Sequence, residues 1–363
     1  MGTERIGKLL LEFSVPAIIS MVFNTLYNVV DTAVLGWFVG EVGVAVTTLA
    51  LPVMTILMGF SMLAGQGGNA LAAIQLGEGK VRLVEKTMGN SAVLLFVMSA
   101  VVALAAFVFI DPVLALIGTT PDLYEPTKQF IQIICVFFGF QSLGMGMNNF
   151  LRTAGKPTLA LVTMMFVAVL GWGVAGSAWA TVAGQACGMV PVMWYFVFVK
   201  SAPFRLKLSC CRPDFRLMLN IMTLGIASFV MQVASTVVSV VFNQVVTKYG
   251  AMDPLGAAGA LAAIGVAQKA TMFAITPMVG LVMGAQPLIG YNYGARNWGR
   301  VLKALKWAEI WGIGFGTVFL LLSHLIPYQL VNLFGVTGDL ERFAVQALQI
   351  YTILYPLVGF QII

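Results

Sequence analysis

The stretch "MGNSAVLLFVMSAVVALAAFVFI", residues 88–110, contains no charged side chain. About 20 apolar residues in a helix cross the roughly 30 Å of hydrocarbon in a bilayer, so this stretch is long enough to span a membrane. Similar uncharged stretches recur along the chain, in which 60% of the residues are hydrophobic and 9% are charged, against roughly 25% charged residues in soluble domains. Because only helices and closed barrels satisfy their backbone hydrogen bonds in lipid, the sequence predicts an all-α polytopic membrane protein.

Charged residues divide the chain into about ten candidate spans. The first run is apolar but carries polar side chains, and no small-residue cleavage site follows it, so we expect a retained span rather than a signal peptide. The ten candidates lie near residues 13–36, 46–76, 88–110, 129–151, 157–170, 174–199, 217–247, 255–293, 307–326 and 343–363.

The basic residues alternate between the connecting segments. Sixteen of the 20 Lys and Arg side chains fall in the segments on one side of the predicted spans, and three fall on the other side. By the positive-inside rule the rich side, which includes the N-terminus, is cytoplasmic, and we expect a multi-pass protein of the plasma (inner) membrane. This placement in short loops gives no basic face for nucleic acid, so no nucleic-acid partner is expected.

Two segments of the chain repeat at nearly one offset. "GGNALAAIQLG" at 67–77 aligns with "GAQPLIGYNYG" at 284–294, an offset of 217, and "GFQ" at 139–141 aligns with "GFQ" at 359–361, an offset of 220. Six spans followed by a copy give two halves of one orientation, related by a pseudo-twofold axis along the membrane normal.

The repeat predicts a domain organisation. Residues 1–199 form an N-terminal helix bundle of spans one to six with a shortened fifth span, 200–216 form a basic cytoplasmic linker, and 217–363 form a C-terminal bundle of spans seven to ten. Since the matched "GFQ" lies close to residue 363, we expect the second half to lack its last two spans.

Three motifs resemble a known family: "SVPAIISMVFNTLYNVVDTAVLG" (14–36), "GWGVAGSAWATVAGQ" (171–185) and "GAQPLIGYNYGARN" (284–297). They are similar to the first, sixth and eighth spans of the multidrug and toxic compound extrusion (MATE) family. The resemblance implies a twelve-span antiporter of two six-helix bundles, which exports organic cations against an inward sodium or proton gradient by alternating access.

The chain departs from the family pattern in its fifth span. That span carries an "NxxxD" pattern in the family and helps to form the cation site, whereas no Asn or Asp lies between Asn149 and Asp214 here. The segment Thr158–Leu170 is also short, about 20 Å as a helix. A deletion of about ten residues explains both features.

A polar stripe runs along the first predicted span. Ser20, Asn24, Asn28 and Asp31 are spaced by four, four and three residues and share one helical face, with Tyr27 one turn before Asp31. A carboxylate within a span usually marks an ion or proton path, and the resemblance implies a functional Asp here. We expect Asp31 to couple transport to a cation or proton, and the alternative is an Asp bonded to its neighbours at the outer mouth.

Other polar residues lie inside predicted spans. Thr181 matches a family position beside the cation site, although a threonine within a helix often bonds its own backbone instead. Lys269 lies within the eighth span, where it either pairs with substrate or a carboxylate, or extends to the interface. We therefore expect coupling by Asp31, Asn28 and Thr181, and a substrate cavity lined by Asn24, Tyr27, Gln185, Gln232, Gln268 and Lys269.

Few alternatives to transport fit the sequence. The four cysteines form no CxxC pair, so we expect no metal and no cofactor beyond the coupling ion, H⁺ or Na⁺. A membrane-embedded enzyme would need clustered His, Asp or Glu side chains and is not favoured. We expect a monomer in contact with membrane lipids that carries small organic, cationic substrates. A lipid or polysaccharide flippase of the same superfamily and a non-transporting truncated remnant stay open as alternatives.

Overall fold

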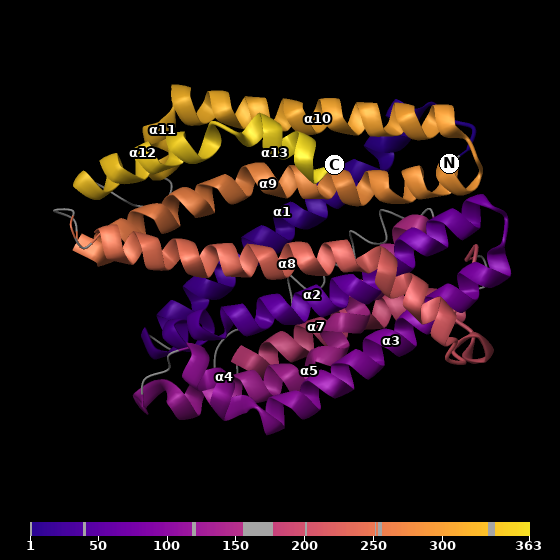
Figure 1. Ribbon diagram of the computed structural model, residues 1–363, viewed down its shortest axis with the longest axis horizontal. Helices are drawn as coiled ribbons and strands as arrows, with labels where there is room; N and C mark the ends of the chain where they lie inside the picture. Colours follow the sequence, from indigo (N-terminus) through magenta and orange to yellow (C-terminus); the bar gives the residue numbers. More distant parts are fainter. Residues whose placement is uncertain are drawn as a thin grey trace. The chain divides into compact units, whose positions relative to one another are not determined.

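The structure is a computed structural model of the chain. It describes residues 2–38, 41–117, 121–154, 177–199, 202–250, 252, 256–332 and 338–363. Within these residues the secondary structure is helical, as predicted (Figure 1). The helices are α1 (Ile6–Phe38), α2 (Glu41–Gly77), α3 (Val81–Val108), α4 (Ile110–Ile117), α5 (Pro121–Thr153), α7 (Ser177–Phe198), the 3₁₀ turn η1 (Leu208–Cys210), α8 (Phe215–Gly250), α9 (Gly256–Gly294), α10 (Trp298–Leu325), α11 (Pro327–Asn332), α12 (Asp339–Thr352) and α13 (Tyr355–Ile362).

The long helices match the predicted spans. Among the described residues, six helices are long and apolar enough to cross a membrane, or seven when α12 and α13 count as one bent span. Helices account for most of the described part of every predicted span but 157–170, which lies outside the described residues. These helices confirm the predicted fold class.

The last predicted span, 343–363, is broken. α12 and α13 meet at a bend of 48°, after which Pro356 stands in the first turn of α13. Proline has no backbone N–H and cannot continue the preceding helix, which accounts for the break there. α10 lies close against α13 because Gly312 and Gly316 have no Cβ, which would otherwise meet the backbone of Gly359 and Tyr355.

The described chain divides into two compact units. Unit 1 comprises residues 1–3, 23–234 and 286–298, and unit 2 comprises 4–22, 235–285 and 299–363. Helices α1, α8 and α9 are each divided between the units, with one segment in unit 1 and the other in unit 2. Each unit therefore contains residues of both predicted halves. The division of the chain into an N-terminal and a C-terminal half stays a proposal, which is based on the sequence repeat.

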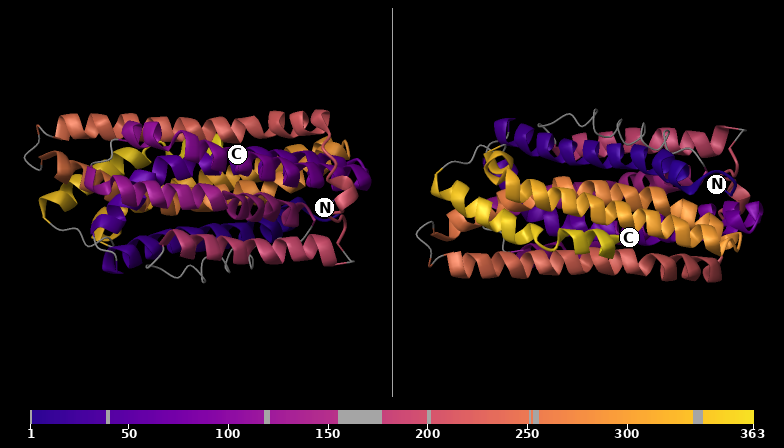
Figure 2. Two further views of the ribbon diagram at one scale, coloured as in Figure 1. Left: turned by 90° about the horizontal axis from the view of Figure 1, so that it is seen from below. Right: turned by 90° about the horizontal axis from the view of Figure 1, so that it is seen from above.

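Unit 1 is a bundle of α2, α3, α5 and α7 with segments of the shared helices. One core cluster, which includes Met88, Phe150 and Phe196, joins α2, α3, α5 and α7, and a second, which includes Leu57 and Phe138, joins α2, α4 and α5. In unit 2, α9 and α10 run antiparallel side by side (Figures 1 and 2), and their core includes Met278, Phe319 and Leu348.

Helix boundaries recur at the offset of the sequence repeat. α2 ends at Gly77 and α9 ends at Gly294; α3 covers Val81–Val108 and α10 covers Trp298–Leu325. Each of these boundaries differs by 217 positions from its counterpart, the offset between the two glycine-bounded motifs. The folded chain thus follows the repeat that the sequence predicts.

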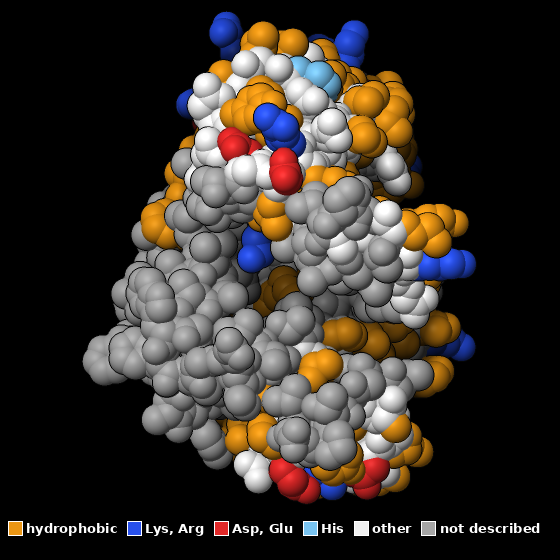
Figure 3. Space-filling view, turned by 90° about the vertical axis from the view of Figure 1, so that its left-hand side faces the viewer, with side chains coloured by type: hydrophobic (Ala, Val, Ile, Leu, Met, Phe, Trp, Pro, Cys, Tyr) orange, Lys and Arg blue, Asp and Glu red, His pale blue; other side chains and the backbone are white. Residues whose placement is uncertain are grey.

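In the view of Figure 3, described hydrophobic side chains lie among polar and backbone atoms, with Lys, Arg, Asp and Glu side chains at several places on this end. The described surface also exposes large apolar residues along the length of α8, including Val230, Val238 and Val241. Such surface suits a lipid environment, in which apolar side chains need no covering.

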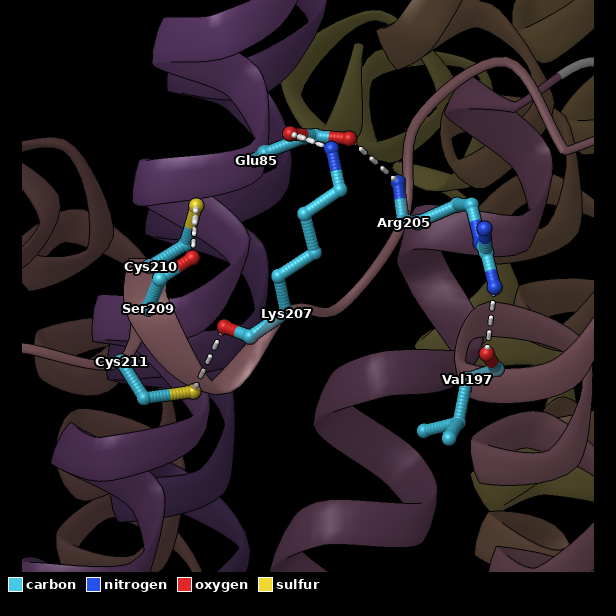
Figure 4. Close-up of polar contacts among 7 residues, drawn as sticks. All are labelled: Glu85, Val197, Arg205, Lys207, Ser209, Cys210 and Cys211. Carbon is cyan, nitrogen blue, oxygen red and sulfur yellow. Dashed lines mark hydrogen bonds and ion pairs between the residues drawn. The ribbon is translucent and has the colours of Figure 1, made fainter.

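The predicted linker is described from residue 202, and its part before α8, residues 202–214, belongs to unit 1 and contacts α3 and α7 (Figure 4). Glu85 of α3 accepts hydrogen bonds from the backbone N–H of Arg205 (3.2 Å) and from Nζ of Lys207 (2.7 Å). The side chain of Phe204 is buried and stacks on Phe196 of α7, with 5.7 Å between the ring centroids. This basic segment is therefore an ordered part of the bundle.

A second side chain of α3 fixes the end of the same segment. Asn90 donates from Nδ2 to the carbonyl oxygen of Arg212 (3.3 Å) and accepts at Oδ1 from the backbone N–H of Asp214 (2.8 Å). Asp214 then caps α8, since its Oδ1 accepts from the N–H groups of Arg216 and Leu217. The start of α8 is thus held against α3.

Candidate functional site

The predicted polar stripe lies on one continuous helix. α1 runs unbroken from Ile6 to Phe38, so Ser20, Asn24, Asn28 and Asp31 fall on one face at helical spacing. Ser20 is fully buried, and its hydroxyl has no hydrogen-bond partner among the described residues. The side chains of Asn24, Tyr27, Asn28 and Asp31 lie outside the described part of the structure.

Two other predicted residues lie on α7. Thr181 is in the first turns of this helix, and its side chain is also outside the described part. Gln185 follows one turn later and is half-buried. Asn24, Tyr27, Asn28, Asp31, Thr181 and Gln185 all belong to unit 1, and so does Gln232 of α8.

Unit 1 contains a polar and aromatic cluster where α2 meets α8. Oγ of Ser228 donates to Oε1 of Gln66 (2.8 Å), and the rings of Phe60 and Phe229 lie 5.0 Å apart between centroids. Gln232 is one turn beyond Ser228, and a Cβ on Gly59 would lie 3.5 Å from its Cβ. The structure thus places the predicted Gln232 beside α2, next to groups that the sequence did not single out.

Unit 2 contains a second such cluster, which includes the predicted Gln268. Its Nε2 donates to the hydroxyl oxygen of Tyr351 (3.3 Å), and Phe242 of α8 meets the Tyr351 ring edge to face at 5.7 Å between centroids. The neighbouring Lys269 is exposed, and it has no ion-pair partner in the described part of the chain. Lys269 therefore extends away from the buried side of α9.

Several residues of these two clusters were not predicted, because the sequence marks them only weakly. Gln66 and Tyr351 are polar residues inside apolar runs, yet neither carries the charge that makes Asp31 conspicuous. Ser228 is one of many serines, and its contact with Gln66 joins positions 162 residues apart. Such pairs emerge only when the helices are packed.

The side chains of these two clusters are of the kinds that bind a ligand. Amide and hydroxyl groups donate and accept hydrogen bonds, and aromatic faces attract cations and flat apolar rings. No group of three or more His, Cys, Asp or Glu side chains that could hold a metal ion occurs among the residues described.

Comparison with known proteins gives the family. The MatE family model matches residues 16–188 and 227–363. The chain is 23% identical over 356 residues to the multidrug export protein MepA of Staphylococcus aureus strain MSSA476, covering 94% of this chain and 77% of that protein. It is 23% identical over 302 residues to the protein of the same name from Staphylococcus haemolyticus, covering 80% and 65%.

Solved structures show the same fold. A multidrug resistance MATE family transporter of the MOP superfamily, in an outward-facing conformation, matches with a TM-score of 0.89 and 19% identity over 98% of this chain and 81% of its own. The MATE multidrug transporter DinF-BH, in complex with a ligand, matches with a TM-score of 0.87 and 30% identity over 99% and 82%. With its series of apolar helices, the chain is a multi-pass membrane protein, and it belongs to the MATE family of transporters, as its sequence motifs predicted.

Proposed function

We propose that this protein exports small organic molecules, many of them cationic, in exchange for protons or sodium ions. Transport rather than catalysis follows from its membership of a transporter family. The names of its relatives support the substrate class: multidrug export proteins, and a multidrug transporter solved in complex with a ligand. We further propose that it resides in the plasma (inner) membrane with its N-terminus in the cytoplasm.

Asp31 is the proposed coupling residue. The observation that carries this proposal is the polar stripe on α1, a helix that is continuous through Asp31. A carboxylate inside a membrane span usually marks an ion or proton path, so we propose that Asp31 binds a proton or sodium ion and releases it when its surroundings become hydrated. In this proposal Asn28 and Thr181 supply further oxygen atoms to the bound ion.

The proposed substrate cavity is lined by amide, phenol and ammonium groups. The clusters around Gln232 and Gln268 support this assignment, since each combines amide groups with aromatic rings. Aromatic faces attract organic cations, and amides hydrogen-bond to varied polar groups, which suits a broad substrate range. The proposed lining residues are Asn24, Tyr27, Gln185, Gln232, Gln268 and Lys269.

The test is transport by the purified chain in liposomes. A fluorescent organic cation is followed under an imposed proton gradient, an imposed sodium gradient, and neither, for the natural protein and for Asp31→Asn. We expect movement under one of the two gradients and background movement for Asp31→Asn, because an amide cannot exchange a proton or neutralise a cation.

The matched control is Asp339→Asn, which changes an exposed carboxylate in the first turn of α12. It is expected to transport like the natural protein. Undiminished gradient-driven transport by Asp31→Asn would refute the coupling role, and the absence of transport by correctly inserted natural protein would refute the function.

A further inference from the structure

The segment 202–214 runs along the first turns of α3, and both belong to unit 1. Near the start of α3, Glu85 accepts from Nζ of Lys207 (2.7 Å). One turn further along α3, a Cβ on Gly89 would meet the carbonyl of Cys210. The segment therefore follows one face of α3 in the direction of the helix and leads directly into α8.

Four basic side chains lie along this contact. Arg82 and Lys86 are one turn apart on α3, and Asn90, which binds the segment, follows one turn later on the same face. Arg212 and Arg216 flank the beginning of α8. All four basic side chains are exposed, and none of them forms an ion pair with a carboxylate in the described part of the chain. We call these four residues the basic cluster.

The two carboxylates of this region already have partners. Glu85 accepts from Nζ of Lys207 and from the backbone N–H of Arg205. Asp214 caps α8 through the backbone N–H groups of its first turn. Since like charges repel one another, a surface with four unpaired cations attracts an anionic partner.

The basic cluster lies at the boundary of two candidate membrane spans. These spans begin at Val81 in α3 and at Phe215 in α8, and the docked segment keeps the two beginnings on one side of unit 1. Phe215 is 81% exposed, and Leu219, one turn later on α8, is also exposed. Exposed apolar side chains thus adjoin the cations, which is the pairing of surfaces that a lipid presents in its acyl chains and its headgroup.

We propose that the basic cluster binds the headgroup of an anionic glycerophospholipid, whose acyl chains lie against Phe215 and Leu219. The phosphate oxygens accept hydrogen bonds from the guanidinium and ammonium groups of the cluster. A zwitterionic lipid carries a cation of its own, which the cluster repels. A free phosphate ion would neutralise the cations but leave the apolar side chains uncovered, so the partner is a membrane lipid. The bound lipid bridges α3 and the beginning of α8, and this role is independent of transport.

Lipid binding by the purified full chain tests the proposal. Native mass spectrometry in detergent, with phosphatidylglycerol or phosphatidylcholine added in steps, measures the binding of single lipid molecules. We expect the natural protein to bind phosphatidylglycerol more tightly than phosphatidylcholine, and the double variant Arg212→Gln, Arg216→Gln to bind phosphatidylglycerol about tenfold more weakly. These substitutions spare the fold, because Arg212 contacts Asn90, and Arg216 contacts Asp214, through backbone atoms.

The matched control removes two exposed cations of unit 2, in the double variant Lys248→Gln, Arg342→Gln. It is expected to bind phosphatidylglycerol like the natural protein, and Arg212→Lys with Arg216→Lys is expected to retain most of the binding because it keeps the charge. Equal binding of the two lipids by the natural protein, or an equal loss in the control and in Arg212→Gln, Arg216→Gln, would overturn the proposal. Displacement of phosphatidylglycerol by an equal concentration of inorganic phosphate would also overturn it, since the site would then bind a free anion.

Discussion

Glu85 is the side chain that ties the basic segment 202–214 to α3. Its side chain is 10% exposed, whereas that of its partner Lys207 is 51% exposed, so solvent screens the ion pair in part. The bond from the backbone N–H of Arg205 is added to that pair. The docking of the segment therefore depends on Glu85 more than on Lys207.

We expect Glu85→Gln to loosen the segment without unfolding the bundle. Trypsin cleavage after Arg205 and Lys207 should rise about fivefold, which corresponds to a loss of about 1 kcal/mol in the docking free energy. The control is Glu78→Gln, whose partner Lys80 lies in the exposed α2–α3 loop. Equal cleavage of both variants would show that Glu85 does not hold the segment.

Asp111 makes a comparable contact between α4 and α5. Its Oδ1 accepts from the hydroxyl of Tyr124 (2.5 Å) and from Nζ of Lys128 (2.9 Å). The hydrogen bond from Tyr124, followed by that from Lys128, lowers the pKa of Asp111 below its usual 3.8. Because the pKa is depressed in the folded state, this stabilisation is complete above pH 3.8 and is lost as the pH falls further.

We therefore expect the protection of α4 against hydrogen exchange to fall in acid. Below pH 3.8 the natural protein should lose protection at residues 110–117, after correction for intrinsic exchange rates. In Tyr124→Phe the loss should be smaller and should be complete at higher pH, because removing the largest cause of the shift brings the pKa of Asp111 in the folded protein closer to 3.8. A loss of the same size over the same pH range in Tyr124→Phe would show that the phenol does not lower the pKa of Asp111.

At the scale of single residues, the sequence identified conspicuous side chains better than their contacts. Asp31 stood out as a charge in an apolar run, and its roles and those of Asn28 and Thr181 stay predictions. The pairing of Asn90 with Arg212 and Asp214 was not predictable, because the two hydrogen bonds of the Asn90 side-chain amide join positions more than 100 residues apart. Contacts of this kind leave no periodic pattern in the sequence.

At the scale of helices, the close approach of α2 and α8 depends on two glycines. A Cβ on Gly67 would meet the carbonyl of Ile221, and a Cβ on Gly225 would meet the carbonyl of Leu63. Two helices approach this closely only when one of the facing positions has no side chain. The α2–α8 packing therefore allows nothing larger than glycine at these positions.

Gly225→Ala is expected to destabilise the protein by about 1–3 kcal/mol, because the added methyl group forces the two helices apart. Gly314→Ala is the matched control: Gly314 also lies within a helix, α10, and nothing lies within 4 Å of an added Cβ. Its effect should stay within about 1 kcal/mol. Thermal unfolding in detergent measures both, and equal midpoints would contradict the close packing of α2 and α8.

Hydropathy predicted which segments are helical but not where the helices begin. α1 begins at Ile6 rather than residue 13, because Ile6, Leu9 and Leu10 are buried although charged residues lie among them. α3 likewise begins at Val81 rather than residue 88. A predicted span that starts after the nearest charged residue is too short when that residue is paired or extends to solvent, because the helix then continues past the charge.

The short helices and one helix break were also missed. The short helices α4 (Ile110–Ile117) and α11 (Pro327–Asn332) begin 217 positions apart, yet neither is long enough to register as a span. The break between α12 and α13 had one signal, Pro356, and sequence alone did not distinguish a kink from an ordinary span there.

At the scale of the whole molecule, the repeat was the most informative prediction. The motifs at 67–77 and 284–294 correctly gave equivalent helix ends, at Gly77 and Gly294. The sequence did not indicate that residues 215–234 of α8 pack with helices of the first half, or that residues 6–22 of α1 group with helices of the second. Hydropathy and repeats order segments along the chain, whereas side-chain packing decides which segments become neighbours.

If this protein couples the movement of organic cations to that of an ion, the coupling must also run in reverse. Liposomes that contain the protein are given a gradient of an organic cation but no proton or sodium gradient, and internal pH and sodium are followed with fluorescent indicators. We predict that the organic cation gradient drives one of these ions in the opposite direction, and that Asp31→Asn abolishes the ion movement while Asp339→Asn preserves it. Movement of the organic cation with no accompanying ion flux would contradict the account.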